Sequence, residues 1–455
     1  MSDPSQSQRG AESRQAPGGI LHEGELTLLL AALVGILGAL STVLFREAIR
    51  AVEWIFVHSQ SGLVEAARAL PWWQRLLVPV AGGLCAGLVL QFGLRLSRSN
   101  RPGDYMEAIA LGDGVLGIRC SLVRSTASLF TIGSGGSIGR EGSMVQLSAL
   151  IGSLVGRALH RDAGRLRLLV ACGAAAGLAS AYNAPLAGAL FVAEVILGTI
   201  AMESFGPLII ASVVANATVH TFLGYQPVYE MPPIQVVSNW ELGRYLVMGV
   251  LLGVAGPWFL WALEGADRAF ASLHLPVFVK LGLGGAVVGM LSIARPEVWG
   301  NGYSVVNSLL HTDWTWTLVG AVLLCKMFAT AATAGSGAVG GVFTPTLFVG
   351  AALGYLFGYA AHAALPQATA PPGTYAVVAM GGFLAATTQA PFLSILMIFE
   401  MTLAYEVVLP LMLACVIGRH VARTRLGAES IYARSLRRNR MEAAQDREPA
   451  GLTRS

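Results

Sequence analysis

The sequence predicts an all-α polytopic membrane protein made of two repeats with broken helices, and three observations lead to this fold class. Of the 455 residues, 54% are hydrophobic and 12% are charged, whereas a soluble domain carries roughly 25% charged residues. Apolar stretches follow one another from Leu26 to Ile417, and two sequence blocks recur in the same order. A water-facing surface around soluble cores is therefore excluded, and most of the surface must face lipid.

Each apolar stretch is long enough to span or partly span a bilayer as a helix, because about 20 apolar residues cross the hydrocarbon core. The clearest stretches are residues 26–45, 76–94, 167–198, 206–223, 244–263, 275–294, 316–334, 340–364, 375–398 and 403–417. Many of the 54 glycines and 20 prolines fall inside them. Non-helical backbone within the bilayer is tolerated only where it is buried in protein or lines a water-filled cavity. We therefore expect a transporter or channel, not a bundle of helices that only anchors the chain.

The recurring blocks define the domain organisation. Residues 180–195 resemble residues 387–402, because an Ala-Pro pair and a glutamate occur at the same spacing in both, and residues 133–143 resemble residues 335–345. A binding site is expected at the interface of the repeats. We divide the chain into a disordered cytosolic tail (1–20), a first membrane repeat (21–225), an inter-repeat connection (226–243), a second membrane repeat (244–440) and a cytosolic C-terminal tail (441–455).

The distribution of charge predicts that both termini are cytosolic. Residues 1–20 lack the basic start and the apolar core of a cleavable signal peptide. Positive residues beside a membrane span favour the cytosolic side, and an N-terminus that also stays inside makes the number of crossings even. The positive residues that follow the last apolar stretch are Arg419, Arg423, Arg425, Arg434, Arg437, Arg438 and Arg440.

Two glycine-containing turns, residues 139–142 and residues 340–345, have the features of an anion site, and each precedes an apolar helix. Free backbone N–H groups at a helix N-terminus attract an anion without holding it as tightly as a desolvated cation. Close helix packing through small residues explains the same glycines equally well. The Arg140 side chain fits a structural or topological cation better than an ion ligand. The candidate residues in these turns are Gly139, Arg140, Gly142 and Gly341.

Glu141 is the candidate gate. It stands at a helix start that attracts an anion, and a carboxylate there mimics one. The ionised side chain blocks the site, whereas the protonated side chain swings out and opens the path. The alternative is a buried carboxylate that only complements the helix dipole. Arg124 and Lys326 each lie upstream of one turn. They either raise the electrostatic potential along the pore entrance or extend to the membrane–water interface.

Other motifs give no support for an enzyme, a cofactor or a metal site. Residues 335–340 match GxGxxG, but no soluble strand precedes them and no acidic residue follows before Glu400. HExxH, GxSxG and Walker A sequences are absent, and the net charge of +4 indicates no nucleic-acid partner. Glu194 and Glu400 are repeat-related, so we expect structural carboxylates. The cysteines lack metal-ligand or disulfide spacing; they are Cys85, Cys120, Cys172, Cys325 and Cys415.

Taken together, these residues resemble the CLC family of chloride channels and chloride/proton exchangers over about residues 26–440. The resemblance rests on GREGS (139–143), GGVFTP (340–345) and the paired segments NAPLAGALFVAEV and QAPFLSILMIFEM. The segments most similar to ClcB-type bacterial members are RPGDYMEAIA (101–110), WGNGYSVV (299–306) and ESIYARSL (429–436). The resemblance implies the CLC fold of two inverted-topology repeats and a homodimer with one anion path in each subunit. It places the gating glutamate on Glu141 and the anion-binding backbone amides on Val342 and Phe343.

Three positions depart from the best-known members of the family. By order along the chain, Pro102 takes the position of the central-site serine; a proline there resembles the nitrate-preferring plant members and removes a hydroxyl donor for chloride. The pore-lining tyrosine falls on Ala428, one helical turn before Tyr432, which shares its helix face. The Tyr432 side chain either extends toward the pore or packs against other side chains, and the second interpretation is favoured. Val195 stands where exchangers carry an inner proton-accepting glutamate, and valine cannot relay a proton.

The leading hypothesis is a multi-pass anion channel of the bacterial inner membrane that is voltage- or proton-gated and passes chloride down its gradient. The ClcB-type resemblance suggests an electrical shunt in acid stress. The alternatives are a chloride/proton antiporter that uses Glu203 or Glu194, a nitrate-preferring transporter, and a substrate-binding or structural membrane subunit without conduction. The expected partners are small anions, the lipid bilayer and a second copy of the chain, with no cofactor besides the transported ion.

Replacing Pro102 with serine tests the placement of the central site. A hydroxyl donor favours compact chloride, so Pro102→Ser is expected to shift the preference from nitrate toward chloride. Chloride and nitrate fluxes into proteoliposomes measure this shift. Unchanged selectivity would show that Pro102 does not line the central site.

Overall fold

The computed structural model describes residues 19–59, 62–97, 103–224, 227–231, 240–366, 369–434 and 436–437. Within these residues the chain is almost entirely helical, and its β-structure is limited to one isolated bridge between Gly139 and Gly341. Nine of the described helices are long and apolar enough to cross a membrane, which confirms the all-α polytopic prediction. Almost all of the two expected tails and most of the connection 226–243 lie outside the described residues.

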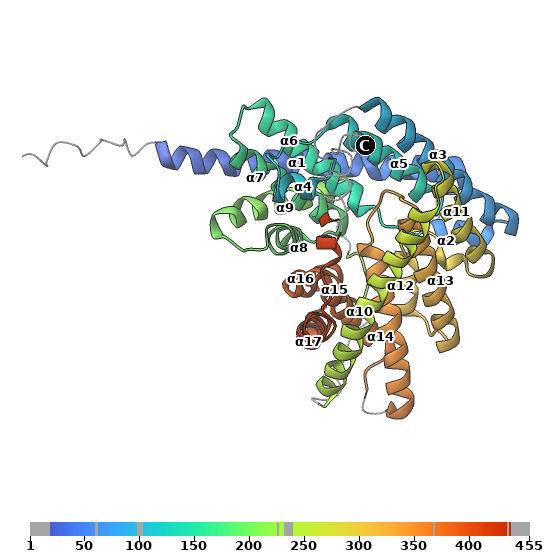
Figure 1. The fold of residues 1–455 in the computed structure, drawn as a ribbon. Helices are drawn as coiled ribbons and strands as arrows, with labels where there is room; N and C mark the ends of the chain where they lie inside the picture. The colour runs from blue at the N-terminus through green and yellow to red at the C-terminus, as the bar shows by residue number, and fades with distance from the viewer. Residues whose placement is uncertain are drawn as a thin grey trace, which may run out of the picture.

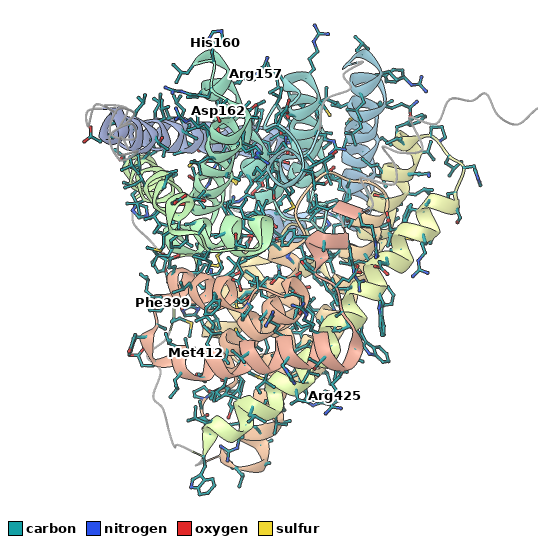
Figure 2. All side chains as sticks on the ribbon, turned by 60° about the vertical axis from the view of Figure 1, so that its left-hand side comes forward. Arg157, His160, Asp162, Phe399, Met412 and Arg425 are labelled. Carbon is teal, nitrogen blue, oxygen red and sulfur yellow. The ribbon has the colours of Figure 1, made fainter. Side chains whose placement is uncertain are left out.

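The first half of the chain lies mostly in the upper part of the molecule in Figure 1, coloured blue to green. In Figure 2, its residues Arg157, His160 and Asp162 mark the turn between α6 and α7 at the top edge. The elements of this half are α1 (Gly19–Val57), α2 (Leu63–Ala69), α3 (Trp72–Ser97), α4 (Tyr105–Ala110), α5 (Ile118–Gly133), α6 (Glu141–Ala158), α7 (Ala163–Tyr182), α8 (Pro185–Leu190), the π-helical η2 (Phe191–Leu197) and α9 (Met202–Leu223).

The second half lies mostly below the first, where Figure 2 labels Phe399 of α16 and Met412 and Arg425 of α17. Its helix α11 is the exception, because it lies beside α3 at the upper right of Figure 1. The elements are α10 (Glu241–Ser272), α11 (Val277–Ala294), η3 (Pro296–Val298), α12 (Tyr303–His311), α13 (Trp316–Gly335), α14 (Phe343–Ala364), α15 (Pro372–Thr388), α16 (Pro391–Thr402), η5 (Tyr405–Val407) and α17 (Val408–Leu426).

Every apolar stretch expected from the sequence overlaps a helix, and two of them are broken beside the Ala-Pro pairs. The stretch 167–198 is divided into α7, α8 and η2, and the stretch 375–398 extends over α15 and α16. The breaks occur at Asn183 and Gln389, whose φ angles of 53° and 62° are left-handed and end a helix. Helices α5 and α6 are not among the expected stretches, because their serine and glutamine side chains, buried against protein, lower their hydropathy.

Aromatic side chains mark the ends of several helices that cross the membrane. Trp72, Trp240 and Trp316 stand at the starts of α3, α10 and α13, and they are 63%, 87% and 58% exposed. Tryptophan is enriched where lipid meets water. By contrast, α7 and α15 are buried along most of their length and consist largely of alanine, glycine and other apolar residues, which allow close helix packing.

Reciprocal contacts relate the two halves, as an inverted repeat requires. In the packing of α3 against α11, the backbone of Leu281 lies directly against Gly83, and the backbone of Pro79 lies directly against Gly285. The two contacts exchange the roles of corresponding residues, because Pro79 precedes Gly83 by the same interval as Leu281 precedes Gly285. Only glycine fits at either place, since a Cβ atom would collide with the opposing carbonyl group.

Glu194 and Glu400 form a second reciprocal contact, between η2 and α16 and between α16 and α8. Each carboxylate accepts hydrogen bonds from two backbone N–H groups at the start of the other half's helix, which are among the groups that a helix leaves unpaired. The donors are Phe392 and Leu393 for Glu194, at 3.3 and 2.7 Å, and Leu186 and Ala187 for Glu400, at 3.0 and 2.8 Å. Both glutamates are therefore structural carboxylates, as the repeat predicts.

Removing either carboxylate is expected to weaken this junction. Glu400→Ala leaves the N–H groups of α8 without their acceptor and should lower the free energy of unfolding by roughly 1–3 kcal/mol. Glu194→Ala should cost a similar amount, because the contacts correspond. Thermal unfolding in detergent measures both variants, with Glu→Gln at each position as the control that keeps one acceptor oxygen. Alanine variants as stable as the glutamine variants would contradict the role of the carboxylates.

Candidate functional site

The starts of α6 and α14 meet at one cavity of about 290 Å³ between the two halves. Gly139 precedes α6 and Gly341 precedes α14, and each donates its N–H to the carbonyl oxygen of the other, at 2.7 and 2.8 Å. The bridge is antiparallel and reciprocal, so it lies on the axis that relates the repeats. It brings the positive ends of two helix dipoles to the same place.

Glu141, the first residue of α6, places its carboxylate on the first turn of α14. The side chain is buried, and its Oε1 accepts the backbone N–H of Thr344 at 3.1 Å. Its Oε2 lies 3.1 Å from Thr344 Oγ1, which donates to it. Thr344 Oγ1 is also 3.0 Å from the hydroxyl of Tyr182. The carboxylate therefore complements the dipole of the helix in the other half, in addition to beginning its own.

The two bridging glycines are not available as anion ligands in this conformation, although both were candidates. Their N–H groups are satisfied by each other, and Gly139 does not line the cavity. Gly142 and Gly341 do line it. Gly142 is needed for the close approach of the turns, since a Cβ atom there would lie 3.1 Å from the backbone nitrogen of Gly341. These glycines thus hold the turns together.

Val342 and Phe343 remain as the candidate backbone donors. Val342 is the N-cap of α14, Phe343 is its first residue, and both line the cavity. Within the part of the chain that the structure describes, no protein acceptor is placed for either N–H group, as is usual for the first turn of a helix. The Phe343 ring packs against Tyr182 at 5.1 Å between ring centroids.

Arg140 lies outside the cavity lining and contacts an aromatic ring. Its guanidinium carbon is 5.8 Å from the ring centroid of Tyr303, a distance at which a cation and a ring attract each other. The interpretation of its side chain as a structural cation therefore fits better than its inclusion among the anion ligands.

Tyr432 reaches the cavity, whereas Ala428 does not. Tyr432 lines the cavity, and its ring packs edge-on against Phe191 at 5.4 Å; Figure 1 shows this red C-terminal segment in the middle of the molecule. Ala428 is buried with Ala386 and Ala422. Tyr432 therefore packs, as favoured, and its side chain also borders the cavity.

Pro102 lies outside the described residues, but the residues after it contribute to the site. Asp104 and Tyr105, at the start of α4, line the cavity. The Asp104 side chain accepts the N–H of Met106 at 2.7 Å, as a helix N-cap. The segment that the resemblance assigns to the central site thus borders the same cavity as Glu141.

Arg124 and Lys326 differ in their positions. Arg124 of α5 lines the cavity. Lys326 of α13 is fully buried, and its ammonium group donates to the carbonyl oxygens of Val298 and Gly300 at 2.8 and 2.6 Å. Lys326 therefore does not extend to an interface, so that interpretation is wrong, and it lies outside the cavity lining. It binds the loop between η3 and α12.

The carboxylates proposed for proton transfer are away from the cavity lining. Glu194 is held by the α16 N–H groups, Val195 follows it in η2, and Glu203 is exposed at the start of α9. Among the described residues, no group of three or more His, Cys, Asp or Glu side chains is placed to hold a metal ion.

Comparisons with known proteins find relatives along almost the whole chain. The family model for voltage gated chloride channels matches residues 82–423. A ClcB-like chloride channel protein of Ralstonia nicotianae is 58% identical over 91% of this chain and 97% of that protein. The voltage-gated ClC-type chloride channel ClcB of Salmonella typhimurium is 42% identical over 89% of this chain and 97% of that protein. These matches confirm the resemblance seen in the sequence.

Solved structures share the fold. A slow cyanobacterial Cl⁻/H⁺ antiporter superposes with a TM-score of 0.80 and 26% identity, over 91% of this chain and 97% of that chain. A CLC-type fluoride/proton antiporter superposes with a TM-score of 0.73 and 21% identity, over 90% of this chain and 98% of that chain. The predicted fold of two inverted repeats is thereby confirmed.

Thr344→Val tests whether the Thr344 hydroxyl stabilises the Glu141 carboxylate in its buried position. Valine keeps the volume but loses the hydroxyl that donates to Oε2, and a hydrogen bond to a charged group contributes about 1.5–3 kcal/mol. The buried position of the ionised Glu141 side chain is then less stable. Anion flux at neutral pH should therefore rise about tenfold, and activation by acid should begin at higher pH. Thr346→Val is the matched control, because that hydroxyl donates to the carbonyl of Val342. Equal flux in both variants would contradict the assignment.

Proposed function

Because the chain belongs to the voltage-gated chloride channel family, also called the CLC family, we propose that it forms a proton-gated path for passive anion flow in which Glu141 is the gate. The observation that carries the proposal is the position of the Glu141 carboxylate. It is buried at the start of α14 and accepts two hydrogen bonds from Thr344. A negative group thus occupies a place where backbone and hydroxyl donors converge beside a cavity.

The gate works by competition for the space beside the first turn of α14. While Glu141 is ionised, its oxygens satisfy the Thr344 donors and repel an arriving anion. Protonation removes the negative charge, so the hold of the helix dipole on the side chain weakens and the carboxyl group can leave. The anion then binds the N–H groups of the first turn of α14, with Val342 and Phe343 as the proposed donors. Partial charges hold the anion weakly enough for it to pass on.

Passive anion flow is supported by two neighbouring residues of η2, Glu194 and Val195. Proton-coupled exchange needs an ionisable group on the inner side that passes a proton to Glu141. Val195 cannot do so, and the neighbouring Glu194 carboxylate is bound to the Phe392 and Leu393 N–H groups. A chloride/proton exchanger is the second candidate, because the cyanobacterial Cl⁻/H⁺ antiporter is 26% identical and aligns with 91% of this chain. In that case Glu203 or water would have to supply the proton.

The remaining features of the proposal follow from the family. We propose chloride as the main anion, with nitrate as the alternative that depends on Pro102, and voltage as a second influence on the gate. We also propose a homodimer with one path in each subunit, placed in the bacterial inner membrane with both termini in the cytosol. An electrical shunt during acid stress is the role that this combination would serve.

Glu141→Gln in proteoliposomes is the decisive test. Glutamine keeps the size of the side chain without its charge, so chloride flux should be high at neutral pH and should change less than about twofold on acidification, whereas wild-type flux should rise steeply. Glu203→Gln is the matched control, because it neutralises an exposed carboxylate outside the cavity lining, and it should keep the wild-type pH dependence.

A proton probe inside the same vesicles separates the candidates. Passive flow predicts that a chloride gradient drives no uphill proton movement. Uphill proton movement in wild type would establish the exchanger instead, and its loss in Glu203→Gln would assign the proton transfer to Glu203. Steep acid activation that persists in Glu141→Gln would remove the gate assignment, and absence of any anion flux would indicate a structural subunit.

A further inference from the structure

Two polar side chains that line the cavity, Gln146 and Ser143, already use their donor groups within the protein. The Gln146 amide nitrogen donates to Ser121 Oγ at 2.8 Å, and its amide oxygen accepts the Tyr105 N–H at 3.1 Å. The Ser143 hydroxyl donates to Ser128 Oγ at 2.6 Å. These groups hold α4, α5 and α6 together, so an anion in the cavity is not expected to use them.

Ser125 of α5 has a donor without a protein partner. The residue is 4% exposed and lines the cavity. Its Oγ is buried and makes no hydrogen bond to any described residue. Buried hydroxyl groups are almost always paired, and an exception calls for a ligand or water that completes the pair. An anion in the cavity is a ligand of the right kind, since a hydroxyl donates to it readily.

Arg124, the preceding residue, adds a cation at the same wall. It lines the cavity and is partly exposed, and no carboxylate of the described residues lies within ion-pair distance of it. A Cβ atom on Gly103 would lie 3.7 Å from the Arg124 guanidinium carbon. The guanidinium group therefore packs against the backbone of the segment in which Pro102 replaces the central-site serine of the family.

We propose that Ser125 and Arg124 form an anion subsite that supplies the hydroxyl donor missing from the segment around Pro102, and that it recognises nitrate in particular. The proposal rests on the proposed function, because the anion must enter this cavity. The planar guanidinium group presents parallel N–H donors to two oxygens of a planar oxyanion. The Ser125 hydroxyl can donate to chloride and to nitrate, so it contributes to the affinity for both anions. Arg124 instead determines the preference for nitrate over chloride. Partial exposure of Arg124 keeps its charge screened, so an anion is not trapped.

Concentration-dependent chloride and nitrate fluxes in proteoliposomes test the subsite. Ser125→Ala should raise the half-saturating concentration of both anions about three- to tenfold. Ser125→Thr keeps the hydroxyl and should stay near wild type. Ser148→Ala is the matched control, because Ser148 Oγ is likewise buried without a described partner but lies outside the cavity lining. If Ser125→Ala does not fold, Ser125→Cys, with its weak donor, replaces it and should give the same direction.

Reversal potentials with chloride on one side and nitrate on the other test the preference. Arg124→Lys keeps the charge and loses the planar fork, so the nitrate-to-chloride permeability ratio should fall about threefold or more. Arg119→Lys is the control, because Arg119 is exposed on the same helix. The proposal is overturned if Ser125→Ala matches Ser148→Ala, or if Arg124→Lys matches Arg119→Lys. The pH response of Glu141→Gln, measured in parallel, reports on the gate independently of these variants.

Discussion

The contact between the Glu141 carboxylate and the first turn of α14 sets the chemistry of the cavity. A buried carboxylate inside a membrane protein is costly unless donors surround it. Here the N–H and hydroxyl of Thr344 are those donors, at 3.1 Å each. A small anion would use the same kind of partial charges, so the side chain and the ion compete for one place. In the proposed gate, this competition would link the protonation of Glu141 to the access of an anion.

The scaffold is symmetric, whereas the side chains in the cavity are not. Reciprocal contacts of Gly83 with Leu281 and of Gly285 with Pro79 hold α3 against α11, and the bridge between the turns brings two helix starts together. At corresponding positions, however, α6 begins with Glu141 and α14 begins with Phe343. Only one of the two helix starts therefore carries an ionisable group, and the proposed gate depends on both halves because Glu141 of α6 is bound by Thr344 of α14.

Much of the fold follows from the sequence because membrane helices leave local signals. Apolar length predicted the spans, and the Ala-Pro pairs predicted the breaks after α7 and α15, where Asn183 and Gln389 adopt left-handed conformations. The repeat also predicted that Glu194 and Glu400 are structural. Helices α5 and α6 were less visible, since their polar residues face protein and lower their hydropathy.

The site followed from the sequence only in part. Motifs predicted Glu141, Val342 and Phe343, and the structure places all three at the cavity, but Thr344 was missed because its contact with Glu141 joins residues 203 positions apart. The contacts of Lys326 were not predicted, because the carbonyl groups of Val298 and Gly300 that bind it carry no charge signal in the sequence.

Bromide-soaked crystals tested for anomalous scattering would examine the competition most directly. In wild-type protein at neutral pH, the carboxylate should occupy the first turn of α14 and no bromide should lie there. In Glu141→Gln, a bromide peak should appear within hydrogen-bond distance of the Val342 or Phe343 N–H. Bromide beside the buried, ionised Glu141 carboxylate, or no bromide in either protein, would contradict the idea that the carboxylate and the anion compete for the same site.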